Sequence, residues 1–582
     1  MVSTLPEPEA LPRPGTPPAT AGQQPIPPQQ PLSPQQPPAG TARALDLQAA
    51  VLRAGYRARR LLVVDVVEAV LAAIADRGND GVWIHVADRG KLLARAAELD
   101  ALAAATAPGD ELPALFGLPF AVKDNIDVAG MPTTAACPGF GYPATAGAPI
   151  VDALLAAGAV CVGKTNLDQF ATGLSGVRSP YGIPTSPFDP AMISGGSSSG
   201  SAVAVAAGLV TFAIGTDTAG SGRVPAALTN TVGIKPSRGL VSSRGVVPAC
   251  RSLDCASVAA LSVPDGRLVL DVISGFDELD PWSRRFPPPA VAAGQDDARQ
   301  GVTGQGVTGG DAAGGDAAGG DAAAALSAGG APGNRGLGAP PVRPSRAATR
   351  PGVPATRPGV PAARLGVPAA ALVAADCDEA VRSVFTRALD LLGGLGAQVV
   401  EVDLAPFLAA GTMLYEGPWL AERYAAIGDF LEEHPQEVHP VVAELLAPGA
   451  RVSGAEVFTG IDRLQALRRQ TEGTWRSVDA LVVPTVPRTY SVADMLADPI
   501  RRNARLGRYT TFGNLLDLAA VAVPVGFAGG LPYGVTVLGP AGSDARLAAL
   551  GAALHASCGV APGLGAFPLA APPGVARADA PA

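Results

Sequence analysis

Three segments contain the residues whose types and spacing could do chemistry. In the first segment, 117–134, Lys123 directly follows the apolar, strand-like run 120–122. That position is unusual, because burying an ammonium ion is costly. Taken alone, such a lysine is most simply explained as a solvated residue at a strand end, paired with Asp124 or Asp127.

The other two segments are rich in glycine and serine. Residues 194–209 read SGGSSSGSAVAVAAGL, and residues 215–236 read GTDTAGSGRVPAALTNTVGIKP. Glycine permits unusual backbone geometry and serine caps helices, so each segment alone is also consistent with a linker or a capped turn. The small residues of 217–221 would let several backbone N–H groups point at one spot, which suits a developing oxyanion.

Together and in this order, the three segments resemble the amidase signature family, whose hallmark is a GGSS(G/S)G run followed by a DxxGSxR-like turn. The separations between Lys123, Ser197 and Ser221 match that family's pattern, and the resemblance covers roughly residues 45–285 and 370–555. It implies an α/β protein with the amidase signature fold. In that fold a large mixed β-sheet core is covered by helices on both faces.

The resemblance also implies catalytic roles. Ser221 would be the nucleophile, Ser197 on a cis peptide bond would relay the proton, and Lys123 would be the base. This Ser-cisSer-Lys arrangement is chemically reasonable, because serine needs a base to take its proton and desolvation can keep a lysine neutral. Glycines next to Ser197 suit an unusual peptide bond.

Supporting roles follow from the same resemblance. The oxyanion hole would consist of the backbone N–H groups of Thr218, Ala219, Gly220 and Ser221. Three further residues would support the site, namely Ser198, Asp217 and Arg223. The sequence departs from the family at Gly222, where Ile or Val is usual, and we expect looser packing there with the catalytic atoms unaffected.

Histidine offers an alternative base. The four histidines are His85, His434, His439 and His555, all distant in sequence from the serine-rich segments. A Ser-His-Asp triad assembles in space and so remains open at this point, although none of the four lies in a recognisable catalytic context. A Ser–Ser–Lys relay needs no histidine.

A finer resemblance concerns the substrate. Three runs resemble the allophanate hydrolase group, whose members finish urea breakdown after urea carboxylase: 163–206, 238–258 and 414–427. In that group a tyrosine and an arginine at the spacing of Tyr415 and Arg423 bind substrate, and Gly173 is a weaker candidate for lining the pocket. A guanidinium can hold a carboxylate with two parallel hydrogen bonds. By spacing alone, however, the pair would be two helix residues, one packed and one solvated.

The implied reaction is hydrolysis of the amide C–N bond of allophanate (urea-1-carboxylate), releasing ammonia and carbon dioxide through a covalent acyl-enzyme. No metal, nucleotide or organic cofactor is expected. The alternatives are a general amidase, or a glutamine-hydrolysing transamidation subunit that works with partner proteins and tRNA. An inactive scaffold in a urea-metabolism assembly, tethered by its repeats, is a third hypothesis.

The elements that must position these residues alternate between helix and strand, which favours an α/β architecture. Helical spacing is found at 64–75, 91–105, 378–393 and 547–555. Strand-like runs are found at 82–86, 398–404, 478–484, 521–525 and 535–538. The short apolar runs are typical of buried strands.

Low-complexity segments divide the chain. We expect a disordered Pro/Gln tail at 1–42, an amidase domain in two parts at 43–287 and 369–565, a flexible insertion at 288–368, and a disordered tail at 566–582. The insertion repeats GGDAA and then a seven-residue unit, which could suggest a solenoid, but the units have no face to bury. The last unit, RLGVPAA, could double as a strand. We expect no further C-terminal domain of the kind common in allophanate hydrolases.

Composition excludes several classes. A net charge of −8 in 582 residues, with no basic cluster, argues against nucleic-acid binding. The six cysteines form no CxxC pair, so neither a disulfide framework nor a zinc site is expected. The longest apolar stretch, 202–214, is too short to span a membrane, and no secretory signal is visible, so we expect a cytoplasmic protein. Family members are often homodimers, and that state is expected by resemblance.

Overall fold

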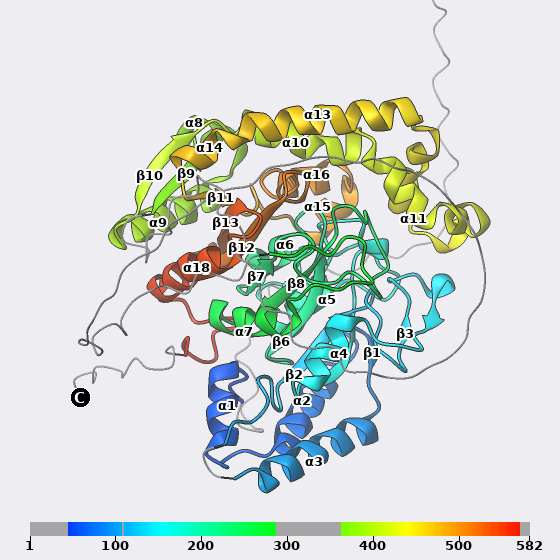
Figure 1. Ribbon diagram of the computed structural model, residues 1–582, viewed down its shortest axis with the longest axis vertical. Coiled ribbons are helices and arrows are strands. Elements are labelled where there is room, and N and C mark those ends of the chain that lie inside the picture. The colour runs from blue at the N-terminus through cyan, green and yellow to red at the C-terminus, as the bar shows by residue number, and fades with distance from the viewer. Residues whose placement is uncertain (1–44, 108–109, 287–362, 571–582) are drawn as a thin grey trace, which may run out of the picture. The chain divides into compact units, whose positions relative to one another are not determined.

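The centre of the fold is one eleven-stranded mixed sheet in the order β1-β5-β2-β6-β8-β7-β12-β13-β11-β9-β10 (Figure 1). The computed structural model describes residues 45–107, 110–286 and 363–570. The strands are β1 (Trp83–Val86), β2 (Pro119–Lys123), β5 (Val160–Thr165), β6 (Phe212–Asp217), β7 (Val232–Lys235), β8 (Cys255–Ala260), β9 (Arg364–Pro368), β10 (Gln398–Val402), β11 (Ala480–Pro484), β12 (Leu518–Ala528) and β13 (Leu531–Pro540). A separate pair joins β3 (Pro132–Thr133) to β4 (Tyr142–Pro143).

The helices begin in several places at a side chain that caps them. Asp378 accepts a hydrogen bond from the Val381 backbone at 3.0 Å at the start of α9, and Ser453 forms a capping box with Glu456 at the start of α13. The helices are α1 (Ala49–Arg57), α2 (Val63–Arg77), α3 (Arg89–Ala105), α4 (Pro149–Ala156), α5 (Ser199–Ala206), α6 (Arg223–Leu228), α7 (Val263–Ile273), α8 (Ala370–Asp376), α9 (Glu379–Gly394), α10 (Ala405–Glu416), α11 (Trp419–Glu433), α12 (Pro440–Leu446), α13 (Gly454–Glu472), α14 (Thr474–Ser477), α15 (Val492–Ala497), α16 (Arg501–Leu506), α17 (Phe512–Leu515) and α18 (Asp544–Cys558).

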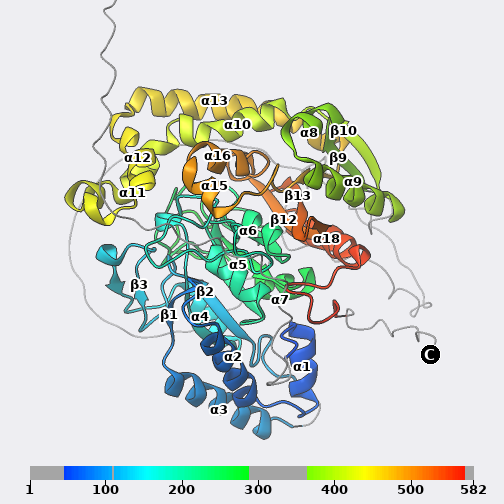
Figure 2. The same cartoon turned by 180° about the vertical axis from the view of Figure 1, so that it is seen from behind.

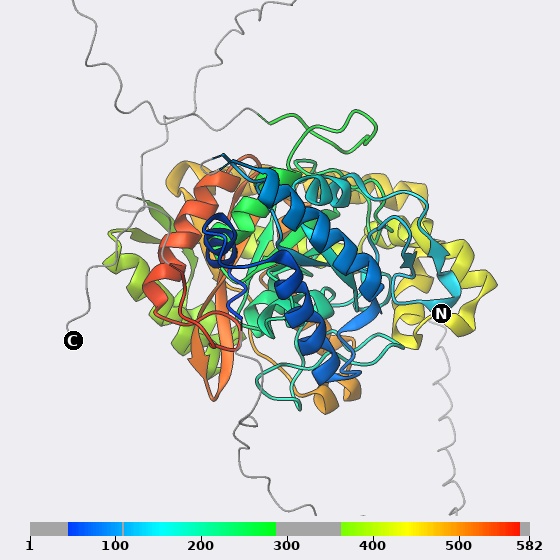
Figure 3. The same ribbon diagram turned by 90° about the horizontal axis from the view of Figure 1, so that it is seen from below.

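Helices cover both faces of the sheet. On β7, Ile234 lies against Gly266 of α7, while the next position, Gly233, lies against Ala226 of α6. Because successive residues of a strand point to opposite faces, α6 and α7 cover opposite sides. Away from these layers, α10 runs beside α13, and α2 packs along α3 (Figures 2 and 3). The expected architecture, a large mixed sheet covered by helices on both faces, is confirmed.

The strand order explains how distant segments meet. β2 pairs in parallel with β6, with Val122 opposite Ile214, and all residues of both strands are buried. The carboxyl ends of neighbouring parallel strands lie at the same edge of a sheet, which is where ligands bind in α/β folds. Lys123 and the turn after Asp217 therefore come together, although 94 residues separate them in sequence.

The expected helices and strands are present, with ends shifted by a few residues. For example, the helix expected at 378–393 is α9, and the strand expected at 521–525 is the central part of the longer β12. β9 is built from the last seven-residue repeat, so it begins inside the range 288–368. The tail 1–42, most of that range, and the end of the chain from 571 lie outside the described residues. In the described ranges every helix is too short or too polar to cross a bilayer. The cytoplasmic location stays a prediction.

Candidate active site

Lys123 is the last residue of β2 and is completely buried, with 0% of its surface exposed. Its Nζ lies 2.8 Å from the Ser197 hydroxyl and 2.7 Å from the Thr216 hydroxyl. The solvated-lysine alternative is therefore wrong. Asp124 forms its ion pair with Lys164 at 2.9 Å, and Asp127 accepts the hydroxyl of Tyr142.

Burial changes the acidity of this amine. Desolvation lowers the pKa of Lys123 from 10.5 to about 7, while the negative charges of Asp168, Asp254 and Asp217 act in the opposite direction. A large part of the population is consequently neutral at physiological pH, with a lone pair able to take a proton. The partner hydroxyls lie within the distance that proton transfer requires.

Ser197 lies in the turn before α5, and its peptide bond with Gly196 is cis. The neighbouring residue, Ser198, links this turn to the end of β6. Its hydroxyl donates to the Thr216 carbonyl at 3.1 Å, and its N–H donates to the Ser221 carbonyl at 3.2 Å. These bonds hold the two serine-rich segments against each other, so the structure brings Lys123, Ser197 and Ser221 into one region.

Ser221 lies in the turn between β6 and α6 and is 2% exposed. Its hydroxyl donates to the Gly173 carbonyl at 3.4 Å. In the described part of the chain, this contact takes the place of a hydrogen bond to Ser197. A relay through Ser197 thus requires rotation of the Ser221 hydroxyl away from Gly173, a torsion with low barriers.

The turn at 217–221 presents several backbone donors. Gly220 has a φ of +131°, in the region that favours glycine, and its N–H donates to Asp217 Oδ1 at 2.9 Å. Gly220 is thus already engaged. Within the ranges described above, the N–H groups of Thr218, Ala219 and Ser221 donate to no protein acceptor, so these three are the candidates for an oxyanion hole.

Arg223 and Asp217 form a fully buried ion pair that braces this turn. Arg223 Nε and Nη2 donate to the two carboxylate oxygens of Asp217 at 2.9 and 2.8 Å. Burial alone would raise the pKa of Asp217, but the charge and hydrogen bonds of Arg223 outweigh burial, and the pKa is lowered. Arg223 also reaches the Thr510 carbonyl at 3.0 Å and the Asn514 side chain at 3.2 Å, which ties the turn to α17.

The surroundings of Gly222 contradict the expectation of loose packing at this position. A Cβ added at Gly222 would lie 2.6 Å from the Ser257 hydroxyl and 2.8 Å from the Ser257 Cβ. The site is therefore closely packed, and the looser packing expected from a glycine there is wrong. The space that an Ile or Val side chain would need is occupied by Ser257 of β8.

Arg423 of α11 lies under the ring of Tyr415 of α10, with its Cζ 5.1 Å from the ring centroid. Arg423 is 2% exposed, and among the side chains that the structure describes its guanidinium makes one hydrogen bond, from Nη1 to the Thr172 hydroxyl at 3.3 Å. Its Nε has no partner, and among the described residues no carboxylate pairs with it. The alternative interpretation, one packed and one solvated residue, is therefore wrong, because Arg423 is buried and Tyr415 is half-buried.

Gly173 connects the two ends of the site. Thr172 contacts Arg423, and the next residue, Gly173, accepts the Ser221 hydroxyl. A side chain at Gly173 would collide with the carboxylate of Asp168. Asp168 accepts N–H groups from Gly176 and from two more loop residues, Ser175 and Arg178, at 3.0–3.2 Å. The loop is thereby fixed in place.

Sequence reasoning missed Thr216, Asp168 and Asp254. Asp254 is half-buried, accepts the Thr218 hydroxyl, and also accepts the backbone N–H of Ala249 at 2.9 Å. Burial raises the pKa of this carboxyl. Thr216 could have been found, because it is adjacent to Asp217 on the strand that pairs with β2. The two aspartates belong to no motif that the sequence analysis used: Asp168 orders the loop that follows it, and Asp254 joins the nearby Ala249 to the distant Thr218.

The histidines do not enter the site. His555 is buried with neither ring nitrogen hydrogen-bonded, and His439 Nδ1 accepts the Val441 N–H at the start of α12. Across the described ranges no histidine contacts Ser221 or Ser197 by a hydrogen bond, so a Ser-His-Asp triad on Ser221 is excluded. In the same ranges no group of three or more His, Cys, Asp or Glu side chains could hold a metal ion.

Similar proteins include enzymes of two kinds. Urea amidolyase from Saccharomyces cerevisiae is 36% identical over 485 residues, covering 82% of this chain and 23% of that protein, so the chain spans less than a quarter of that relative's length. A glutamyl-tRNA(Gln) amidotransferase protein from Symbiobacterium thermophilum is 33% identical over 529 residues, covering 86% of this chain and 94% of that protein.

Solved structures and a family model agree with this grouping. An allophanate hydrolase structure from Kluyveromyces lactis has a TM-score of 0.70 at 33% identity, covering 87% of this chain and 73% of that one. A model of the amidase family, described as "Amidase", matches residues 65–303 and 350–548. The chain therefore belongs to the amidase signature family.

Proposed function

We propose that this chain is an amidohydrolase that cleaves allophanate, the carboxylate of urea, at its terminal amide. The observation that carries the proposal is the buried guanidinium of Arg423, which has no carboxylate partner among the described residues. Burial lowers the pKa of Arg423, but nearby groups that include Asp254 and Glu422 outweigh burial without a direct ion pair, and the pKa is raised. The donors that the guanidinium leaves unused are therefore available to the carboxylate of a ligand. The names of the similar proteins, urea amidolyase and allophanate hydrolase, support the same substrate.

Two adjacent residues of one loop contact Arg423 and Ser221. The contacts to these two residues come from Thr172 and Gly173, whose Cα atoms are about 3.8 Å apart. In allophanate a single nitrogen separates the carboxylate from the scissile carbonyl. In glutamine three carbons separate them, and the α-ammonium group would need its own counter-charge. Allophanate needs no such counter-charge, which favours allophanate over glutamine in this proposal.

The proposed reaction begins with neutral Lys123. Lys123 takes the proton of Ser197, Ser197 takes that of Ser221, and the Ser221 oxygen attacks the terminal carbonyl carbon. The oxyanion is stabilised by the N–H groups of Thr218, Ala219 and Ser221. The relay then returns the proton to the leaving nitrogen, and ammonia departs from an acyl-enzyme ester.

Water completes the cycle. It gives up a proton to the same relay, attacks the ester carbonyl, and restores the Ser221 hydroxyl while the dicarboxylated amine is released. That product breaks down to carbon dioxide and a second ammonia. A urea carboxylase is the proposed source of allophanate, and both reactions are proposed to occur in the cytoplasm.

Ammonia release tests the substrate directly. The purified chain should release ammonia from allophanate with a kcat/KM well above those for acetamide, benzamide and glutamine. Ser221→Ala should abolish release while leaving the circular dichroism spectrum unchanged. Faster turnover of glutamine would instead support a transamidation role, and unchanged turnover in Ser221→Ala would remove the enzyme assignment altogether.

Arg423→Lys tests the recognition step. Lysine keeps the charge but loses the planar fork, so KM for allophanate should rise roughly tenfold or more with a smaller change in kcat. Neutral amides without a carboxylate should be affected little. Arg469→Lys, on the exposed side of α13, is the matched control and should leave both constants unchanged.

A further inference from the structure

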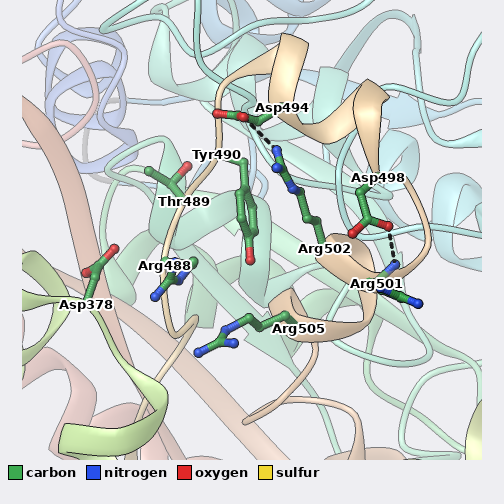
Figure 4. A pocket seen from close by; sticks show the side chains of 9 residues that line it. All are labelled: Asp378, Arg488, Thr489, Tyr490, Asp494, Asp498, Arg501, Arg502 and Arg505. Atoms are coloured by element: carbon green, nitrogen blue, oxygen red, sulfur yellow. Dashed lines mark hydrogen bonds and ion pairs between the residues drawn. The ribbon is translucent and has the colours of Figure 1, made fainter.

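A cavity of about 610 Å³ lies outside the site described above. It is formed by the loop after β11, by α15 and α16, and by the residue that caps α9 (Figure 4). Its lining contains four arginines, three aspartates and two residues with hydroxyl groups: Arg488, Arg501, Arg502, Arg505, Asp378, Asp494, Asp498, Thr489 and Tyr490. Its polar lining is suited to a charged ligand.

The carboxylates around this cavity are already engaged. Asp494 pairs with Arg502 at 2.8 Å, Asp378 caps α9, and Asp498 accepts the backbone N–H of Arg501 at 3.4 Å. Of these three, only Asp494 is in an ion pair among the described residues, so Asp378 and Asp498 keep their negative charge next to the three remaining arginines. The net charge of the lining, four arginines against three aspartates, is positive.

Three of the four arginines, Arg488, Arg501 and Arg505, have no carboxylate partner among the described residues, and of these three Arg488 and Arg505 are the ones whose charges act on Tyr490. In the part of the chain that the structure describes, neither forms an ion pair. Arg505 donates to the Asp376 carbonyl at 2.9 Å, and the buried Nε of Arg488 has no acceptor. Both guanidinium groups therefore retain unused donors.

Tyr490 stands between these two guanidinium groups. Figure 4 shows its ring extending into the space near Arg488 and Arg505, with the hydroxyl at that end. Burial raises the pKa of Tyr490, the positive charges of Arg488, Arg505 and Arg502 oppose that rise, and the negative charge of Asp378 adds to it. The cavity therefore presents three hydrogen-bond donor groups together, namely the Tyr490 hydroxyl and the guanidinium groups of Arg488 and Arg505.

We propose that this cavity binds a small phosphate-bearing anion, held by Arg488 and Arg505 and by the hydroxyl of Tyr490. Planar guanidinium groups pair with phosphate oxygens through two parallel hydrogen bonds each. A tetrahedral phosphate offers enough oxygens for both forks and the phenol at once, whereas a single carboxylate has only two.

The cavity is connected to the active site through α16. On this helix Arg505 lines the cavity, while the buried Asn503 accepts the N–H of Leu174 at 2.7 Å in the loop that contains Gly173. Just before the helix, the Pro499 carbonyl accepts Arg178 of the same loop at 2.7 Å. An anion that restrains α16 should therefore also restrain residues 172–178. Such coupling between two sites is reciprocal.

Titration calorimetry on the full chain tests binding. Inorganic phosphate and pyrophosphate, at constant ionic strength, should show saturable binding that acetate does not compete for. The double variant Arg488→Gln/Arg505→Gln should bind at least roughly tenfold more weakly. The control Arg463→Gln/Arg469→Gln, a matched change of two charges on exposed positions of α13, should bind as the unchanged protein does. Equal affinity in the double variant, or non-saturable heat with both anions, would overturn the proposal.

Hydrogen exchange tests the connection to the loop. Saturating pyrophosphate should slow amide exchange at residues 172–178 in the unchanged protein and leave it unaltered in the double variant. Melting curves without anion establish that the variant is folded. Unaltered exchange despite calorimetric binding would refute the coupling. Neither measurement uses turnover, so a failure here is distinct from a failure of the proposed amidohydrolase function.

Discussion

The pH dependence of turnover follows from the environment of Lys123. Burial shifts its pKa from 10.5 to about 7, which corresponds to about 5 kcal/mol against the charged form. Only the neutral amine can accept the proton of Ser197. With a pKa near 7, about 10% of the enzyme carries a neutral amine at pH 6 and about 90% at pH 8.

We therefore expect kcat/KM for allophanate to fall about tenfold from pH 8 to pH 6, along a single ionisation near pH 7. Initial rates of ammonia release at constant ionic strength, from pH 5.5 to 9, measure this directly. Circular dichroism at each pH separates loss of the base from loss of the fold. Lys123→Arg is the matched variant, because a guanidinium stays protonated throughout this range and should be inactive at every pH.

Two outcomes would refute this account of Lys123. A rate that is constant from pH 6 to 9 would mean that proton transfer to this amine does not limit kcat/KM. An apparent pKa above 9 would mean that the amine is charged at neutral pH, and a different base would then have to serve Ser197.

Three further predictions concern stability. Asp217→Asn leaves the buried Arg223 without its carboxylate and should lower the free energy of unfolding by about 3–5 kcal/mol, as read from urea denaturation. Gly222→Val, the change toward the family's usual residue, should cost about 1–3 kcal/mol because of Ser257, and Ser257→Gly in the same chain should recover part of the loss in thermal melting. Burial lowers the pKa of His555 from 6.5 to about 4, so stability should be complete above pH 6.5 and decline by about 3 kcal/mol as the pH falls toward 4; His555→Leu should flatten that part of the pH–stability curve.

Much of the fold could be anticipated from local sequence. Buried strands such as β11 and β13 are short apolar runs, and α9 has both an amphipathic pattern and a capping aspartate. The order of the strands in the sheet could not be predicted from the sequence. For example, β9 lies between β11 and β10, although it precedes both of them in the chain. That order depends on long-range pairing, which no local pattern encodes.

In the site, too, some residues could be predicted from local sequence and others depend on long-range contacts. Lys123, Ser197 and Ser221 stand out through motifs, and the structure places them together. The burial of Arg423 could not be deduced from helical spacing, because it depends on the loop at Thr172, some 250 residues earlier. Similarly, the engagement of the Gly220 N–H by Asp217 depends on the detailed geometry of one turn.

The origin of Arg423 on α11, far along the chain from the strand ends that hold Ser221 and Lys123, has an evolutionary consequence. In the proposed function, bond cleavage and the choice of amide reside on different parts of the polypeptide, so mutations in 405–433 would change the substrate while the reacting groups stay untouched. New specificities within this lineage can then arise by divergence of those two helices alone. Exchanging them between relatives becomes a practical way of redirecting the enzyme.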